Sequence, residues 1–122
     1  LALLDARMGE VYSGFYERMG DGYVLRGDIR VSAPADVILP SEAGWVACGN
    51  GLSAYPLLQE RLQAAGRPGD AAVLPRASVV AALAAVKARR GEGIDAALAA
   101  PLYIRDKVAK TVAERLNEGG RA

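Results

Sequence analysis

The chain has 122 residues, 52% of them hydrophobic and 24% charged, which suits one folded domain and excludes a disordered chain. Its 15 basic and 14 acidic residues leave a net charge of +1, which argues against a strongly basic nucleic-acid-binding surface. The absence of histidine excludes histidine-based acid–base catalysis and removes the commonest zinc ligand. No apolar run reaches the roughly 18 residues that a membrane-spanning helix needs, so we expect no membrane contact.

The first third of the chain predicts three strands joined by short turns. Residues 1–6 are mostly apolar, and a turn around Gly9 leads to a second strand at residues 11–18. After a glycine-rich turn, residues 23–31 alternate between two faces. Short connections of this kind favour an antiparallel meander. The apolar face of the third strand is predicted to hold Tyr23, Leu25, Ile29 and Val31.

The middle of the chain predicts shorter elements. Ser32 is expected to cap a helical turn that ends at Pro40, and residues 45–48 are expected to form a strand that buries the single cysteine, Cys48. A helix is predicted over residues 54–65, stopped by Gly66. The face of that helix directed at the core is expected to hold Leu58, Leu62 and Ala65.

The last part of the chain predicts a strand at residues 71–74 and a helix at residues 76–90. An extended segment at 101–105 and a final helix at 106–117 follow. The inward positions of the 76–90 helix are expected to be Val79, Leu83 and Val86. The order of elements matches a ribonuclease-H-like unit, which is one half of an actin-like fold. We therefore predict an α/β domain whose mixed sheet combines the meander with parallel strands and flanking helices.

Two segments are candidates for a ligand site. Asp5 ends the first strand and could hold a divalent metal together with Glu10, Asp28 or Asp36, but an aspartate before a tight turn commonly accepts hydrogen bonds from local backbone amides. Gly49-Asn50-Gly51 follows a strand and precedes a helix, where amides can bind phosphate, although the glycines also suit a tight turn. At Asp5 we favour the hydrogen bonds to local amides over a metal site, and at Gly49-Asn50-Gly51 we favour the tight turn over a phosphate site.

Three further charged residues and one aromatic residue have structural interpretations as well. Arg7 and Glu10 flank the turn and could form an ion pair across it. Arg105 could bind a carboxylate bidentately, either inside this domain or on another one. Tyr12 is expected to make core and cross-strand contacts, because its surroundings are not basic enough for base stacking.

Two segments carry a resemblance to a known family. Asp5-Ala-Arg-Met-Gly-Glu-Val-Tyr12 resembles the signature that opens the second half of TsaB (YeaZ-like) proteins, and Pro101-Leu-Tyr-Ile-Arg105 resembles their closing motif. Gly49-Asn-Gly51 followed by Tyr55 is similar to a weaker family segment. The matches run in order, and nothing in this sequence corresponds to the family's amino-terminal half.

The resemblance implies that residues 1–105 are the second actin-like domain and that residues 106–122 are a carboxy-terminal helix and tail. It implies a cytoplasmic, non-catalytic scaffold that supports a TsaD-like catalytic paralogue and a TsaE-like ATPase in making threonylcarbamoyladenosine, with tRNA contacted only indirectly. No metal or cofactor is expected in this chain, while ATP or ADP is allowed in the intact complex. The signature positions Asp5, Arg7, Glu10, Tyr12 and Arg105 are given no catalytic role.

Other functions stay open at this point. The alternatives are a nucleotide-binding actin-like or kinase fragment that uses Gly49 to Gly51, a nuclease that uses Asp5, and a peptidase, as older labels of the wider family say. Residues 92–122, or the sheet edge near them, are expected to expose apolar surface where the missing half would pack. Such a surface could also support a homodimer.

Overall fold

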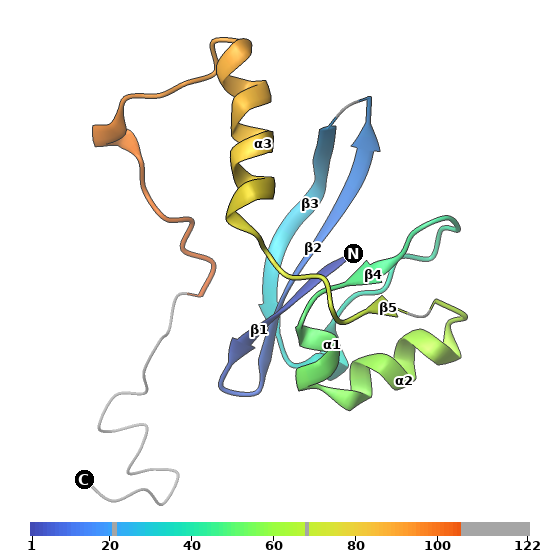
Figure 1. The fold of residues 1–122 in the computed structure, drawn as a ribbon. Helices are drawn as coiled ribbons and strands as arrows, with labels where there is room; N and C mark the ends of the chain where they lie inside the picture. Colours follow the sequence, from blue (N-terminus) through green and yellow to red (C-terminus); the bar gives the residue numbers. More distant parts are fainter. Residues whose placement is uncertain (21, 68, 106–122) are drawn as a thin grey trace, which may run out of the picture.

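The fold is an α/β arrangement in a computed structural model that describes residues 1–20, 22–67 and 69–105 (Figure 1). In chain order the elements are β1 (Ala2–Arg7), β2 (Glu10–Met19), β3 (Gly22–Ser32), the 3₁₀ turn η1 (Pro34–Asp36), β4 (Ala47–Cys48), α1 (Gly51–Ala54), α2 (Pro56–Ala64), β5 (Gly69–Asp70), α3 (Ala77–Arg89) and the 3₁₀ turn η2 (Ala96–Leu98). No helix among the described residues is long and apolar enough to cross a membrane.

The five strands form one mixed sheet in the order β3-β2-β1-β4-β5. β1 pairs with β2 and β2 with β3 in antiparallel register, which confirms the predicted meander. β4 joins the other side of β1 in parallel, and β5 joins β4 in parallel. Because opposite residues in paired strands share a face, the pair Leu3 and Ser13 points to one side of the sheet and the pair Leu4 and Tyr12 to the other.

The core lies between one face of the sheet and the helices α1 and α2. Leu3 and Val11 contribute from the strands, and Leu52, Leu58 and Leu62 contribute from the helices; all five are almost fully buried. Val37 and Trp45 close the cluster from the connection between β3 and β4, and Ala47 contributes from β4 itself. The sheet face that carries Leu3 is called the helix face below, and the face that carries Leu4 is called the second face.

The predicted helix over residues 54–65 is present as α2, which begins two residues later and ends one residue earlier, and a separate short helical turn, α1, precedes it. A short turn, α1, stops at Tyr55, and Pro56 then occupies the first position of α2, where its missing N–H costs nothing. Leu58 and Leu62 are buried as predicted, but Ala65 is exposed because it lies beyond the end of the helix. Gly66, at φ +65°, ends α2 as expected.

Several predicted boundaries were wrong. Ser32 is the last residue of β3 and caps no helix; η1 begins at Pro34, after Ala33, and ends at Asp36 rather than at Pro40. The strand predicted at 45–48 is limited to Ala47 and Cys48, and Cys48 is only half-buried.

The last strand of the sheet lies before the segment predicted for it. Residues 71–74 are not a strand, because the Asp70 carboxylate accepts the Ala72 N–H in a local turn that ends β5. β5 instead contains Gly69, where an added Cβ would lie 2.5 Å from Leu52 Cδ1. Glycine therefore allows β5 to pack directly beside the core.

The helix predicted over residues 76–90 exists, but its predicted burial was wrong. No residue of α3 is buried, and Val79 and Leu83 are 54% and 48% exposed. Figure 1 shows α3 on the far side of a long connection from β5, apart from α1 and α2. Helical spacing determines which residues share a face, but it does not determine what that face contacts.

The described residues that follow α3, up to residue 105, contain little regular structure. Residues 101–105 form neither helix nor strand, and the predicted helix at 106–117 lies outside the described residues. The expected apolar exposure after residue 92 is present in the described part. Four side chains there are between 71% and 80% exposed: Ile94, Leu98, Leu102 and Tyr103.

Candidate functional site

The signature residues gather around the tight turn between β1 and β2. Arg7, Met8 and Gly9 all have positive φ, at 62°, 56° and 77°. Arg7 and Met8 are two consecutive non-glycine residues in the left-handed backbone conformation, which costs of the order of 1–3 kcal/mol for each residue. The surrounding contacts must therefore hold them in place. The register between β1 and β2 also shifts between Asp5 and Arg7.

Asp5 holds the helix-face side of this turn. Its Oδ1 accepts hydrogen bonds from the Arg7 N–H at 2.9 Å and from the Tyr55 hydroxyl at 2.9 Å. Its Oδ2 lies 3.1 Å from Arg7 Nη1. The Arg7 amide, then the Tyr55 hydroxyl and the Arg7 charge hold the pKa of Asp5 below its ordinary value, against an opposing effect of burial.

The same contacts act on Tyr55 in the opposite direction. Burial, followed by its hydrogen bond to Asp5 and the negative charge of that carboxylate, raises the pKa of the Tyr55 hydroxyl. Tyr55 therefore remains a hydrogen-bond donor at neutral pH. The pair joins the end of β1 to the start of α2, across 50 residues of sequence.

The Gly49-Asn50-Gly51 loop packs against β1. A Cβ at Gly49, where φ is +122°, would lie 2.1 Å from the carbonyl oxygen of Leu3, and a Cβ at Gly51 would lie 3.0 Å from the same oxygen. Asn50 Oδ1 accepts the backbone N–H of Asp5 at 3.1 Å. The loop therefore needs its glycines for close packing and its asparagine to hold the first strand.

This packing bears on the phosphate loop considered from the sequence. The Gly49 N–H already donates to the Asp70 carbonyl at 3.0 Å, and both glycines are buried. The α1 helix that follows has only four residues and offers little dipole. The geometry favours the structural reading of Gly49, Asn50 and Gly51 over phosphate binding.

Arg105 holds the second-face side of the turn. Its Nη2 donates to Glu10 Oε2 at 2.5 Å, to the Ala6 carbonyl at 3.0 Å and to the Arg7 carbonyl at 3.4 Å. The guanidinium also lies over the Tyr12 ring, 5.9 Å from its centre. With its side chain 13% exposed, Arg105 attaches the 101–105 segment to the start of the chain.

These contacts decide two alternatives left open by the sequence. Arg7 pairs with Asp5, and Glu10 pairs with Arg105, so the expected pair between Arg7 and Glu10 was wrong. Arg105 binds its carboxylate inside this domain, through one nitrogen rather than bidentately. We call Asp5, Asn50, Tyr55, Glu10 and Arg105 the turn clasp, because they hold the strained turn from both faces of the sheet.

Sequence reasoning found the clasp only in part. It singled out Asp5, Arg7, Glu10, Tyr12 and Arg105, and the structure brings all five to one turn. It missed the contact between Asn50 and Asp5 and the one between Tyr55 and Asp5. The only signal for Tyr55 was its place after the Gly-Asn-Gly segment.

The acidic side chains do not form a metal site in the described part of the chain. No group of three or more acidic or cysteine side chains lies close enough there to hold an ion. Glu10 is held by Arg105, Asp28 lies on β3, and Asp36 lies in η1. Within residues 1–20, 22–67 and 69–105, Asp5 is not joined by the carboxylates that a nuclease-like metal site would need.

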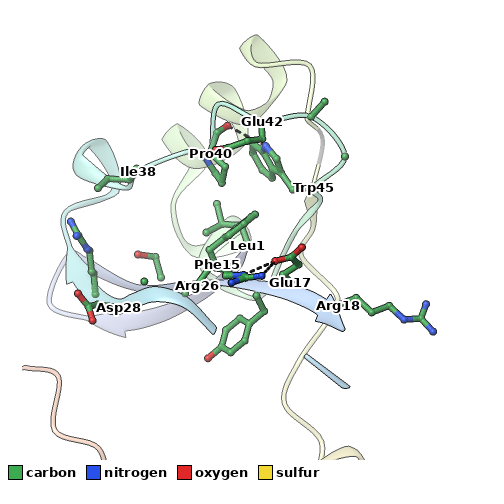
Figure 2. Close-up of a pocket in the computed structure, with 17 residues that line it drawn as sticks. Leu1, Phe15, Glu17, Arg18, Arg26, Asp28, Ile38, Pro40, Glu42 and Trp45 are labelled. Atoms are coloured by element: carbon green, nitrogen blue, oxygen red, sulfur yellow. Dashed lines mark hydrogen bonds and ion pairs between the residues drawn. The ribbon is translucent and has the colours of Figure 1, made fainter. Parts of the chain in front are cut away.

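A cavity of about 760 Å³ lies away from the clasp, between the outer half of the β2–β3 hairpin and the loop that ends at Trp45 (Figure 2). Leu1, Phe15 and Trp45 give it apolar surface, and Figure 2 shows Glu17 paired with Arg26 below them. Its charged lining residues are three arginines and three acids, Arg18, Arg26, Arg30, Glu17, Asp28 and Glu42. Balanced charge of this kind does not favour a phosphate-bearing ligand.

Comparisons with known proteins find relatives that are all named TsaB or YeaZ, or described as similar to YeaZ. The tRNA threonylcarbamoyladenosine biosynthesis protein TsaB of Escherichia coli K12 is 30% identical over 113 residues, which is 89% of this chain and 48% of that protein. YeaZ from Pseudomonas aeruginosa is 34% identical, with a TM-score of 0.67 over 84% of this chain and 47% of its own. No family model matches the chain.

A further crystal structure from Pseudomonas aeruginosa, described as an uncharacterized protein similar to peptidase YeaZ, is also 34% identical. Its TM-score is 0.69, over 85% of this chain and 48% of that protein. The chain therefore spans about half the length of the relatives it matches. The match confirms the resemblance that the signature segments carry.

Proposed function

Since the chain belongs to the TsaB (YeaZ-like) family and corresponds to the carboxy-terminal half of its members, we propose that it takes part in tRNA threonylcarbamoyladenosine biosynthesis. Its proposed role is that of a non-catalytic accessory subunit. It supports a TsaD-like catalytic paralogue together with a TsaE-like ATPase, and it meets tRNA only through that complex. We also propose that the domain has an actin-like, ribonuclease-H-like fold.

The turn clasp is the observation that supports a positioning role. Its carboxylates accept hydrogen bonds from Arg7, Tyr55 and Arg105, and Asn50 is used to hold the backbone of β1. Groups committed to one another in this way stabilise a geometry and are poorly placed to accept or release protons. The absence of histidine from the whole sequence agrees with this reading.

The rival functions have less support from the described residues. A nucleotide site at Gly49 to Gly51 would need amides that face solvent, and a nuclease site at Asp5 would need further carboxylates beside it. The word peptidase belongs to the description of one structural relative. Binding of ATP or ADP by this domain alone, or cleavage with magnesium that is lost in Asp5→Asn, would favour these rivals.

Co-purification with TsaD tests the proposal. The tagged chain, and the same chain joined to the amino-terminal half that its relatives have, are expressed with TsaD from the same source. We expect the longer form to capture TsaD and this chain alone to capture much less. Failure of both forms, with TsaE and nucleotide present, would contradict an accessory role.

A further inference from the structure

The cavity beside Trp45 contains the one buried polar side chain of the described residues. Ser13 is 8% exposed and lines the cavity from β2. Within residues 1–20, 22–67 and 69–105, no protein group forms a hydrogen bond with its hydroxyl. A buried hydroxyl needs a hydrogen-bond partner to be stable. Here that partner has to come from the cavity, as water or as a bound molecule.

Arg30 lies opposite Ser13 on the neighbouring strand. The register of β2 and β3 pairs the two residues, so both side chains point to the helix face, where the cavity lies. Arg30 forms no ion pair with an acid in the described part of the chain. A hydroxyl and a guanidinium group can both donate hydrogen bonds, and side by side they fit a carboxylate.

The other charged residues of the cavity differ in what they can offer a ligand. Arg26 and Glu17 neutralise each other. Figure 2 shows the Arg18 side chain directed away from the cavity. Asp28 on β3 and Glu42 on the loop line the cavity and have no ion pair among the described residues. These two carboxylates are acceptors of the kind that an ammonium group binds.

Apolar surface completes the lining of the cavity. Leu1, Phe15 and Trp45 supply it, and Figure 2 shows Trp45 and Pro40 above Leu1. The Trp45 Nε1–H donates to the Pro40 carbonyl at 3.1 Å, so the indole offers the cavity only its apolar ring atoms. The volume of about 760 Å³ lies within the range of roughly 300–1,000 Å³ that is usual for small-molecule sites.

We propose that this cavity binds a small zwitterion with an apolar body, of the class formed by apolar amino acids and short peptides. The carboxylate of the ligand binds Ser13 and Arg30, and its ammonium group binds Asp28 and Glu42. The apolar body packs against Trp45. Balanced charge in the lining favours a ligand that carries both signs and no net charge. The inference goes beyond the proposed function and does not depend on it.

Tryptophan fluorescence reports on this site, because Trp45 is the single tryptophan of the chain and lines the cavity. The first probe is the dipeptide leucyl-phenylalanine, which has both free ends and does not fluoresce where tryptophan does. Free phenylalanine is titrated in parallel. We expect a saturable change in emission with the dipeptide. The ratio of the two dissociation constants then tells whether the site prefers a peptide or a single amino acid.

Capped dipeptides and matched variants test the two ends of the ligand separately. Amidation removes the carboxylate and acetylation removes the ammonium group, and we expect each cap to weaken binding about tenfold. Arg30→Gln should weaken binding of the free dipeptide by a similar factor and leave the amidated form unaffected. Asp28→Asn combined with Glu42→Gln should weaken the free dipeptide and leave the acetylated form unaffected. Arg18→Gln is the matched control and should change neither.

Several outcomes would overturn the proposal. They are the absence of a saturable change with the dipeptide, equal binding of free and capped dipeptides, and equal effects of Arg18→Gln and Arg30→Gln. Ser13→Ala provides a second variant, because it removes only a hydroxyl and fits the space of the original side chain. It should weaken binding of the free dipeptide severalfold while thermal unfolding shows that the fold is retained. Unchanged binding by a folded Ser13→Ala protein would place the carboxylate elsewhere and contradict the assignment.

Discussion

Removal of the Arg105 side chain is the sharpest test of the turn clasp. Arg105→Ala deletes the contact with Glu10, which is 38% exposed, and the donor to the Ala6 carbonyl. A partly exposed ion pair contributes up to about 1 kcal/mol, and a hydrogen bond to a partly buried carbonyl contributes about 1 kcal/mol more. We therefore expect the free energy of unfolding to fall by about 2 kcal/mol, which lowers the melting temperature by roughly 8 °C.

The control for this variant is the exposed pair between Arg26 and Glu17, whose side chains are 51% and 52% exposed. Arg26→Ala should cost less than about 1 kcal/mol, because solvent already screens that pair. Urea unfolding followed by circular dichroism measures both variants. Equal midpoints for Arg105→Ala and Arg26→Ala would refute the account, since Arg105 would then hold nothing that an ordinary surface arginine does not.

Three further changes test other parts of the structure. Gly49→Ala should lower the free energy of unfolding by at least about 3 kcal/mol, because its Cβ would collide with a strand carbonyl. Gly66→Ala, in open space at φ +65°, should lower it by only about 1 kcal/mol. Thermal unfolding of both variants measures the difference. Tyr55→Phe removes one donor to Asp5 and should raise the pKa of Asp5, as measured by NMR titration. Because the pKa of Asp5 is lowered in the folded protein, its ionised carboxylate stabilises the fold at pH values above the ordinary pKa of 3.8, and this contribution is lost as the pH falls through the folded pKa. Tyr55→Phe should therefore begin acid unfolding at a higher pH than wild type. An unchanged onset would contradict the contact between Tyr55 and Asp5. Leu58→Ala should cost about 3 kcal/mol in urea unfolding because Leu58 is fully buried, and a cost below about 1 kcal/mol would place α2 elsewhere.

The fold was predictable where the signal is local. Alternation along residues 23–31 and glycines in the turns were enough to predict the meander of β1, β2 and β3. Leu58 and Leu62 were placed correctly because they are four residues apart on one helix. The position of β5 was predicted wrongly because this strand has only two residues, one of them Gly69, and two residues are too few to show an alternating pattern.

The pairings of the clasp could not be predicted from spacing. Asp5 and Tyr55 are 50 residues apart, and Glu10 and Arg105 are 95 residues apart, so no local pattern relates the members of either pair. Arg7 and Glu10 looked like partners because they are close in sequence. The bulge and the left-handed turn instead direct Arg7 to Asp5 on one face and Glu10 to Arg105 on the other.

The central claim is that this chain serves as the carboxy-terminal half of a TsaB-type accessory subunit. The most direct test replaces the carboxy-terminal half of Escherichia coli TsaB with this chain, in cells depleted of their own TsaB, and measures threonylcarbamoyladenosine in tRNA by mass spectrometry of nucleosides. The account predicts that the chimera restores the modified nucleoside toward the level given by intact TsaB. A folded, well-expressed chimera that leaves the tRNA as unmodified as an empty vector does would contradict it.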